Sequence, residues 1–396
     1  MENTFSNRTN WNFSENKLSF RLKSLKDQGV AIIDLSESNP TRCNFNYLTN
    51  LELLKPLTHP NNLKYNPSTQ GKKEAREAIQ SYYQSKCIEV DLKCIFLTSS
   101  TSEAYNYIFR LITNPNDHIL IPRPSYPLFN FIAELNDIEL DYYPIQYRND
   151  EWQTNFKEIQ NVHRDAKAVV LVHPNNPTGS FVKTKETQEL IKIAKSKSLS
   201  LISDEVFLDY WFDKNAERVV SFSNTQEILT FTLGGTSKCL GLPQMKLSWI
   251  VISGPEKTVN QAIQRLEIIA DTYLSVNTPS QESLVHWFAH QNQIQNEIKE
   301  RLNANRSWLS KQIPQTGITF LNSEGGWYAI IKLPDFKSEE EWALEFLEKD
   351  HVFVHPGYFF DFEEEAFVIL SLLPESSQFQ EGCQKILNRV RKIRRL

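Results

Sequence analysis

The sequence has no excess of positive charge and no long apolar run. Its 396 residues include 43 lysines and arginines against 48 aspartates and glutamates, a formal net charge of -5. Non-specific binding to DNA or RNA requires a broad basic surface, so we expect no nucleic-acid partner. No stretch approaches the roughly 18 apolar residues of a membrane span, and the first twenty residues lack an apolar signal-peptide core. We therefore expect neither membrane insertion nor secretion.

Cysteine and glycine are also scarce. The five cysteines are scattered and never spaced as CxxC, a pattern that predicts neither a disulfide framework nor a zinc site. We expect no bound metal and a reducing cytoplasm. Because the chain has only 12 glycines, the pairs Gly234-Gly235 and Gly325-Gly326 mark places where the backbone geometry is special.

Between about residues 94 and 253, short β-branched runs alternate with longer amphipathic segments. Several runs are apolar almost throughout, which is typical of strands covered on both faces. This alternation indicates an α/β fold with a mostly parallel sheet and helices on both sides. The expected strands are 94–98, 118–122, 168–173, 201–206, 228–233 and 247–253, and the expected helices include 102–112, 126–135 and 185–197.

The pattern changes after Gly254 and predicts a smaller α+β unit. A basic terminal helix has apolar residues at helical spacing, so we expect it to pack and to expose its charged face, rather than to bind nucleic acid or membrane. The other elements expected here are a long helical region over about 255–312, strands at 318–321, 326–333, 352–356 and 367–372, and a helix near 338–349. The predicted domains are an N-terminal arm with part of the small domain at 1–45, a large domain at 46–285 and a C-terminal small domain at 286–396.

The ends of the expected strands carry unusual polar residues, and ligands bind at the carboxyl ends of an open parallel sheet. Ser99 to Glu103 follow strand 94–98 and begin a helix, whose free amides and dipole suit a phosphate. The alternative is a helix cap without a ligand, because Ser100 and Glu103 have the spacing of a capping box.

Three further strand ends each carry a weaker signal. The turn 174–179, PNNPTG, is stiff and can fix the position of an amide donor for a ligand; the alternative is a turn with a structural role only. Asp204 lies in an otherwise apolar strand and needs a cation or donor as partner; the alternative is a structural aspartate bound to backbone amides. Lys238 follows a glycine pair that lacks the GxxxxGK[ST] spacing of a nucleotide-binding loop.

Taken together, these groups form the set that holds pyridoxal phosphate. Lys238 would form the Schiff base, Asp204 would keep the pyridine nitrogen protonated, and Asn176 would hydrogen-bond the ring 3-oxygen. The phosphate would lie on the hydroxyl-rich turn formed by Ser100, Thr101 and Ser102. The order Asn176, Asp204, Lys238 along successive strand ends is the specific signal.

Nine segments resemble the class I/II aminotransferases, the aspartate-aminotransferase-like group of fold type I pyridoxal phosphate enzymes. They are SNPTR (38–42), YNPSTQG (65–71), LTSSTSEA (97–104), PRPSYPLF (122–129), HPNNPTG (173–179), SDEVF (203–207), TSKCLGLPQMK (236–246), EGGWY (324–328) and HPGYFF (355–360). The resemblance covers essentially the whole chain. It implies a homodimer with active sites at the subunit interface, a large cofactor domain and a small domain built from both termini.

The same resemblance implies further site residues. Tyr126 would stack on the cofactor ring, and Tyr65 would reach the phosphate of the neighbouring subunit. The cofactor site would also include Ser237 and Lys246. The substrate would lie against Ser38, Asn39 and Asn176.

Two departures from the family pattern concern the cofactor ring and its phosphate. Phe207 replaces a tyrosine that donates to the 3-oxygen, with Tyr210 as a candidate substitute, so we expect a raised pKa of the Schiff base. Lys246 replaces a phosphate-binding arginine and keeps the charge without the bidentate fork, and Gly235 replaces a serine.

The largest departure concerns the substrate. Ile369 stands where the family has the arginine that clamps the substrate carboxylate. Either another basic residue supplies the clamp, with Arg42 the first candidate, or the substrate lacks that carboxylate.

The sequence therefore predicts a cytoplasmic, homodimeric, pyridoxal phosphate-dependent aminotransferase acting on an amino acid, or another amine, and a 2-oxo acid. Lys238 would be the general base, and the ring, kept protonated by Asp204, would draw off the developing charge. Tyr126, the third predicted catalytic residue, would stack on that ring. Two alternatives stay open: a β-eliminating or carbon–sulfur lyase on the same cofactor, and a catalytically impaired protein that only binds it.

Overall fold

The computed structural model describes residues 4–213, 217–274, 276–364 and 366–394. Its strands are β1 (Ile33–Asp34), β2 (Ile95–Thr98), β3 (His118–Arg123), β4 (Glu139–Arg148), β5 (Glu151–Thr154), β6 (Ala166–Val172), β7 (Ser200–Asp204), β8 (Thr230–Gly235), β9 (Ser248–Ser253), β10 (Thr319–Leu321), β11 (Tyr328–Lys332), β12 (Val352–Phe353), β13 (His355–Pro356) and β14 (Phe367–Ser371). Its α-helices are α1 (Lys17–Asp27), α2 (Lys73–Gln84), α3 (Thr101–Ile112), α4 (Phe129–Leu135), α5 (Thr184–Lys197), α6 (Thr236–Cys239), α7 (Glu256–Tyr273), α8 (Thr278–Ala289), α9 (Gln291–Gln312), α10 (Glu339–Asp350) and α11 (Ser376–Arg394).

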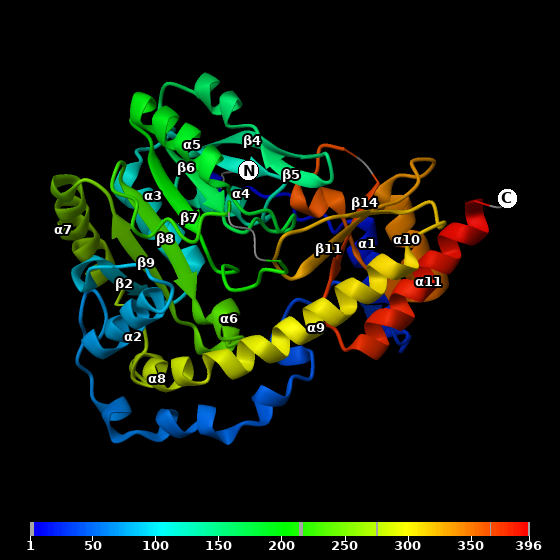
Figure 1. The fold of residues 1–396 in the computed structure, drawn as a ribbon, viewed down its shortest axis with the longest axis horizontal. Coiled ribbons are helices and arrows are strands. Elements are labelled where there is room, and N and C mark those ends of the chain that lie inside the picture. Colours follow the sequence, from blue (N-terminus) through cyan, green and yellow to red (C-terminus); the bar gives the residue numbers. More distant parts are fainter. Residues whose placement is uncertain (1–3, 214–216, 275, 365, 395–396) are drawn as a thin grey trace.

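An eight-stranded mixed sheet forms the centre of the larger part of the molecule, with the order β2-β9-β8-β7-β6-β3-β4-β5 (Figure 1). The pairs β4·β3, β3·β6, β6·β7 and β7·β8 are parallel. β9 runs antiparallel to both of its neighbours, and β5 runs antiparallel to β4. The carboxyl ends of β8, β7, β6 and β3 therefore meet along one edge.

Helices cover both faces of this sheet. Successive strand residues point to opposite faces, so Leu201 of β7 joins one core while Ile202 joins the other. α3, α4 and α7 pack on the face of Ile202, and α2, α5 and α8 pack on the face of Leu201. Burial on both faces explains why these strands are apolar almost throughout.

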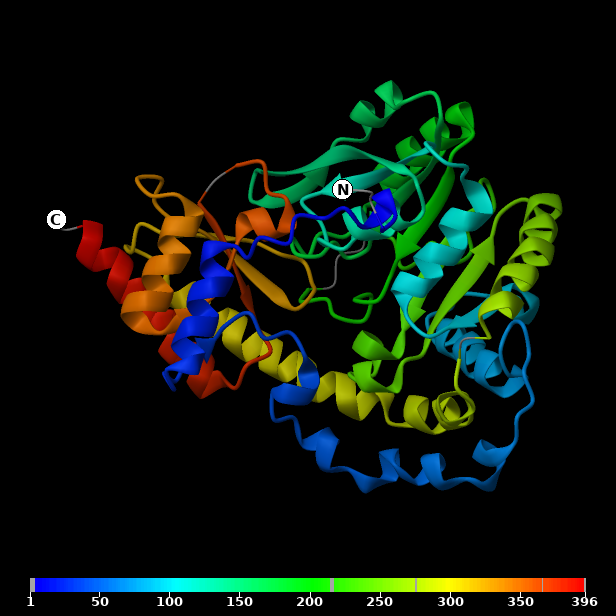
Figure 2. The same ribbon diagram turned by 180° about the vertical axis from the view of Figure 1, so that it is seen from behind.

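A smaller antiparallel sheet, β10-β11-β14-β13, lies beside the larger part, with α1, α10 and α11 nearby (Figures 1 and 2). β1, near the N-terminus, pairs in parallel with β12. The long helix α9 bridges the two parts: Gln295 donates to the Cys239 carbonyl at 2.8 Å, and Asn305 donates to the Leu372 carbonyl at 2.9 Å.

The expected α/β architecture is confirmed, with a few differences. Every expected strand is present, although 352–356 is divided into β12 and β13. The region 255–312 is helical but consists of α7, α8 and α9, because Leu274 adopts a left-handed conformation (φ 51°) that ends α7. The hairpin β4–β5 was not expected; Pro144 interrupts its alternating pattern, which weakened the strand signal.

The predicted domain boundaries stay a prediction. The boundary at 285/286 falls inside α8, whereas the boundary at 45/46 coincides with the start of a 3-10 turn at Asn46–Thr49. No helix within the described residues is long and apolar enough to span a membrane.

Candidate functional site

The carboxyl edge of the large sheet brings the predicted residues together. Asp204 ends β7, Lys238 follows β8 and Asn176 follows β6, and these three strands are neighbours. Tyr126 follows β3, the next strand along, and Ser100 follows β2 on the other side. Residues far apart in the chain thus face one edge, as the strand-end argument predicted.

Lys238 lies in the short helix α6, between aromatic rings. Its Nζ lies 4.7 Å from the centre of the Trp327 ring and 5.3 Å from that of Phe207. Burial lowers the pKa of Lys238 to about 8, and the charge of Asp204 opposes this lowering. A much larger fraction of this amine is therefore neutral at physiological pH than of an exposed lysine, and the neutral form is the nucleophile and base.

Asp204 has the partners that its apolar strand requires. The Tyr105 hydroxyl donates to Oδ2 at 3.1 Å, and the Val206 amide donates to Oδ1 at 3.2 Å. Burial raises the pKa of Asp204 to about 6, while these two donors and the charge of Lys238 lower it. Sequence reasoning indicated that a donor was needed but missed Tyr105, which reaches the strand end from α3.

The turn that carries Asn176 is locked by its neighbours. Asn175 Oδ1 accepts hydrogen bonds from the Thr178 amide at 3.2 Å and the Thr178 hydroxyl at 2.8 Å. Gly179 has φ +71°, and a Cβ there would lie 2.2 Å from the Gly325 carbonyl oxygen, so a side chain does not fit. Asn176 Oδ1 is buried and has no hydrogen-bond partner among the described residues. The Asn176 side chain therefore has an unused acceptor at Oδ1.

The start of α3 shows both features that the sequence suggested. Ser100 Oγ accepts from the Glu103 amide at 3.1 Å, which is a helix cap. The Glu103 carboxylate accepts from the amide and the hydroxyl of Ser99, at 2.7 and 2.9 Å, and so stiffens the turn. The next amides, of Thr101 and Ser102, have no carbonyl partner inside a helix because they belong to its first turn. The cap therefore coexists with an anion-binding helix end.

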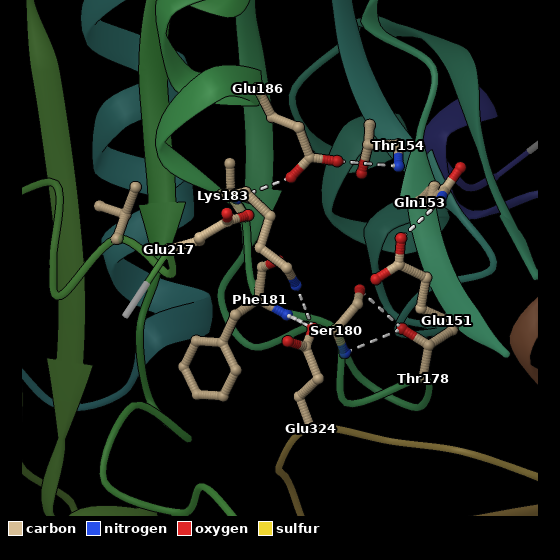
Figure 3. A network of polar contacts seen from close by, with 12 residues as sticks. Glu151, Gln153, Thr154, Thr178, Ser180, Phe181, Lys183, Glu186, Glu217 and Glu324 are labelled. Atoms are coloured by element: carbon tan, nitrogen blue, oxygen red, sulfur yellow. Dashed lines mark hydrogen bonds and ion pairs between the residues drawn. The ribbon is translucent and has the colours of Figure 1, made fainter. Parts of the chain in front are cut away.

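Glu324 connects the Asn176 turn with the segment that carries Trp327 (Figure 3). Its carboxylate accepts from the Phe181 amide at 3.0 Å and pairs with Lys183. Its carbonyl accepts from the Phe212 amide at 2.9 Å, and the Gly326 amide donates to the Tyr210 carbonyl at 2.7 Å. These bonds hold segment 324–328 against the large sheet and place Trp327 beside Lys238. The sequence analysis identified EGGWY as a motif but not this role of Glu324.

Among the remaining cofactor residues, Tyr126 has a hydroxyl whose pKa is raised by burial and also by the nearby charge of Asp204. Ser237 is partly exposed and precedes Lys238, and Lys246 is exposed just before β9. Tyr65 is 79% exposed and stands outside the cluster of this single chain.

Three of the predicted substrate residues, Ser38, Asn39 and Arg42, lie on segment 38–42. Ser38 lies close enough to Tyr328 to lower the pKa of its hydroxyl, which burial raises, and Asn39 Oδ1 accepts from the Thr41 amide at 3.0 Å. The Arg42 side chain is 74% exposed, and its Nη1 lies 3.5 Å from Glu37. The structure therefore turns the Arg42 guanidinium to solvent rather than toward Lys238.

The departures from the family pattern have structural counterparts. Phe207 is buried and packs against Trp327. The Tyr210 hydroxyl donates to the Lys238 carbonyl at 2.7 Å, so Tyr210 is already engaged and does not offer its proton to a cofactor ring, contrary to our suggestion. A Cβ at Gly235 would lie 2.5 Å from Ser248 Oγ, so a serine there would require Ser248 to move.

These groups fit pyridoxal phosphate. The site offers an amine with a lowered pKa, a carboxylate on the adjacent strand end, an asparagine whose side-chain NH2 can donate, and a capped helix start. Each matches one part of the cofactor: aldehyde, pyridine nitrogen, 3-oxygen and phosphate. No cluster of three or more His, Cys, Asp or Glu side chains suited to a metal ion occurs in the part of the chain that the structure describes.

Comparison with known proteins agrees with this geometry. A family model described as aminotransferase class I and II matches residues 32–386. The glutamate-pyruvate aminotransferase AlaA of Haemophilus influenzae is 26% identical over 379 residues, 91% of either chain, and that of Escherichia coli K12 is 25% identical over 350 residues, 86% of this chain and 85% of its own. Among solved structures, an alanine aminotransferase from Pyrococcus furiosus superposes with a TM-score of 0.88 at 22% identity, covering 98% of this chain and 100% of its own.

Proposed function

Because the chain belongs to the aminotransferase class I and II family, whose cofactor is pyridoxal phosphate, it is a transaminase, and we propose that Lys238 carries its cofactor and that its substrates are an amino acid and a 2-oxo acid. The observation that carries this proposal is the pair of Lys238 and Asp204 on neighbouring strand ends, each with a shifted pKa. The names of the bacterial relatives, glutamate-pyruvate aminotransferases, support these substrate classes.

When bound, the cofactor supplies an electron sink for the charge that develops at the substrate Cα. The neutral ε-amine of Lys238 would be the base that takes the proton from the substrate Cα. Asp204 holds a proton on the pyridine nitrogen, and Tyr105 keeps that carboxylate oriented. Trp327 and Phe207 exclude water from the lysine.

We also infer that the chain works as a homodimer in the cytoplasm. The turns from Asn46 to Leu63 run along the outside of the larger part (Figure 2), and the exposed fractions of Leu51, Leu63 and Tyr65 are 71%, 93% and 79%. Such exposed apolar side chains on one segment favour a partner surface. A second copy would place Tyr65 at a neighbouring site, which matches the role that the resemblance gives it. All five cysteines are free thiols, which supports a reducing compartment.

The decisive experiment is a half-reaction screen of the purified protein reconstituted with pyridoxal phosphate. Amino acids and simple amines are added without an oxo acid, and loss of the cofactor's visible band is followed. Borohydride reduction, digestion and mass spectrometry then locate the cofactor. We expect bleaching by at least one amino acid and an adduct on Lys238. Pyruvate and ammonia released without an acceptor would indicate a lyase instead, and no bleaching by any amine would indicate an impaired protein.

Phe207 gives a spectroscopic prediction. Because the site lacks a hydroxyl at this position, the protonated linkage between Lys238 and the cofactor should keep its proton to high pH. Phe207→Tyr should lower the pKa of this linkage by about one unit, since a donor to the 3-oxygen favours the deprotonated form. The measurement is a pH titration of the visible spectrum.

A wild-type pKa already as low as that of Phe207→Tyr would contradict this expectation. Tyr210→Phe provides the comparison. Because the Tyr210 hydroxyl is bonded to the Lys238 carbonyl, we expect its removal not to raise the pKa of the linkage.

A further inference from the structure

Ile369, which stands where the family has an arginine, is a buried apolar residue of the small sheet. Ile369 is 0% exposed in β14, between Ile330 of β11 and His355 of β13. Directly paired residues of antiparallel strands project their side chains to the same face and lie about 5 Å apart at Cβ. His355 is therefore the polar neighbour that stands beside Ile369 on its own face.

This face is the one turned toward the cofactor site. Tyr328 pairs with Ser371, two residues along β14 from Ile369, and so shares its face. Burial raises the pKa of the Tyr328 hydroxyl, and this hydroxyl is close enough to Ser38 and Tyr126 for both of them to affect that pKa. The sheet face that carries His355 thus meets two predicted site residues.

Aromatic contacts connect His355 with the same region. The ring of His355 lies 5.9 Å from that of Phe360, which lies 6.0 Å from that of Tyr328. The Phe360 carbonyl accepts from the Ser125 amide at 3.0 Å, next to Tyr126.

The His355 imidazole has unused hydrogen-bonding capacity. Its Nδ1 is buried without a partner among the described residues, although the side chain as a whole keeps partial exposure. Burial lowers the pKa of His355, and the charge of Asp34 opposes this, so the ring is largely neutral at pH 7 and has one N–H to donate. In the tautomer that carries its proton on Nδ1, this N–H is a buried donor, and buried donors normally have an acceptor. The described residues offer none, so we infer that the acceptor comes from outside the chain.

Two arginines near these strands are committed elsewhere. Arg42 is mostly in solvent beside Glu37. Arg301 Nη1 donates to the carbonyls of Cys43 and Leu373, at 3.3 and 3.2 Å.

We propose that the imidazole of His355 receives the α-carboxylate of the amino-acid substrate, in the place of the arginine that Ile369 replaces. This inference rests on the proposed function. A single imidazole N–H binds a carboxylate less strongly than a bidentate guanidinium does. An amine without a carboxylate should therefore lose less affinity at this site than at a site that contains an arginine.

The test compares two amines that cannot lose a Cα proton. 2-Methylalanine has a carboxylate, and tert-butylamine carries a methyl group in its place. Both are titrated into the protein reconstituted with pyridoxal phosphate, and the change in the visible band gives a dissociation constant without turnover. We expect wild type to bind 2-methylalanine more tightly. His355→Leu should weaken 2-methylalanine about tenfold to a hundredfold and change tert-butylamine less than about twofold.

Two variants separate recognition from packing. Ile330→Val loosens the opposite side of Ile369 without removing a polar group, and we expect both dissociation constants to stay within about twofold of wild type. Ile369→Arg in the His355→Leu background should restore selective binding of 2-methylalanine. Thermal melting checks that each variant is folded.

Several results would overturn the inference. They are equal effects of His355→Leu on both amines, no effect on either, selective weakening by Arg42→Ala but not by His355→Leu, and wild-type preference for tert-butylamine. A wild-type protein that is bleached by an amino acid in the half-reaction screen but binds neither test amine would overturn this inference alone. A protein that responds to no amine in either experiment would overturn the proposed function.

Discussion

Lys238→Ala should reduce the half-reaction with any amino acid by at least about 1,000-fold, because it removes both the attachment point and the general base. Stopped-flow measurement of the visible band gives the rate. Lys257→Ala, on the exposed surface of α7, is the matched control and should leave the rate unchanged. A Lys238→Ala protein within tenfold of wild type would show that another group moves the proton.

The same lysine gives a pH dependence with a definite sign. Only the neutral amine adds to the cofactor aldehyde, and the pKa of Lys238 is about 8. The rate at which the apoprotein attaches pyridoxal phosphate should therefore rise through about pH 8 and level off above it. An exposed lysine would show the rise near pH 10.4 instead.

The second large effect is expected at Asp204. Asp204→Asn keeps the size of the side chain but removes the negative charge that holds a proton on the pyridine nitrogen. We expect kcat/KM to fall at least about 100-fold, as for loss of one preorganised electrostatic group in an active site. Steady-state kinetics with the best amino acid from the screen provides the measurement.

Tyr105→Phe is the companion variant for Asp204. It removes one hydrogen bond to the carboxylate and leaves the charge, so a loss of about tenfold or less is expected. If kcat/KM of Asp204→Asn were no lower than that of Tyr105→Phe, the negative charge of Asp204 would not be required for the reaction.

The fold could be predicted largely because the strands that are buried on both faces consist of apolar residues. β6 and β8 lie inside the sheet with both faces covered, and this burial explains their apolar sequences. β4 lies toward the rim with an alternating pattern and a proline, and it was missed. The left-handed residue Leu274 that divides the long helical region is neither glycine nor asparagine, so it gives no sequence signal.

The candidate site divides in a similar way. Asn176, Asp204 and Lys238 could be identified because each stands directly at a strand end, where position in the chain fixes position in space. Tyr105, Glu324 and His355 could not, because each reaches the site from another element through tertiary packing. The Arg42 prediction relied on proximity in sequence to the 38–40 loop, and the structure shows the side chain facing solvent.

The pairing of β1 with β12 has a consequence for biosynthesis. Ile33 is synthesised before all the strands of the large sheet, and its partner Val352 is synthesised after them. All eight strands of the large sheet lie between them in the sequence, so this sheet can form on the ribosome before the partner of β1 has been made. β1 must therefore remain without its neighbouring strand while the large sheet is made, and a chain truncated before β12 would leave β1 permanently unpaired.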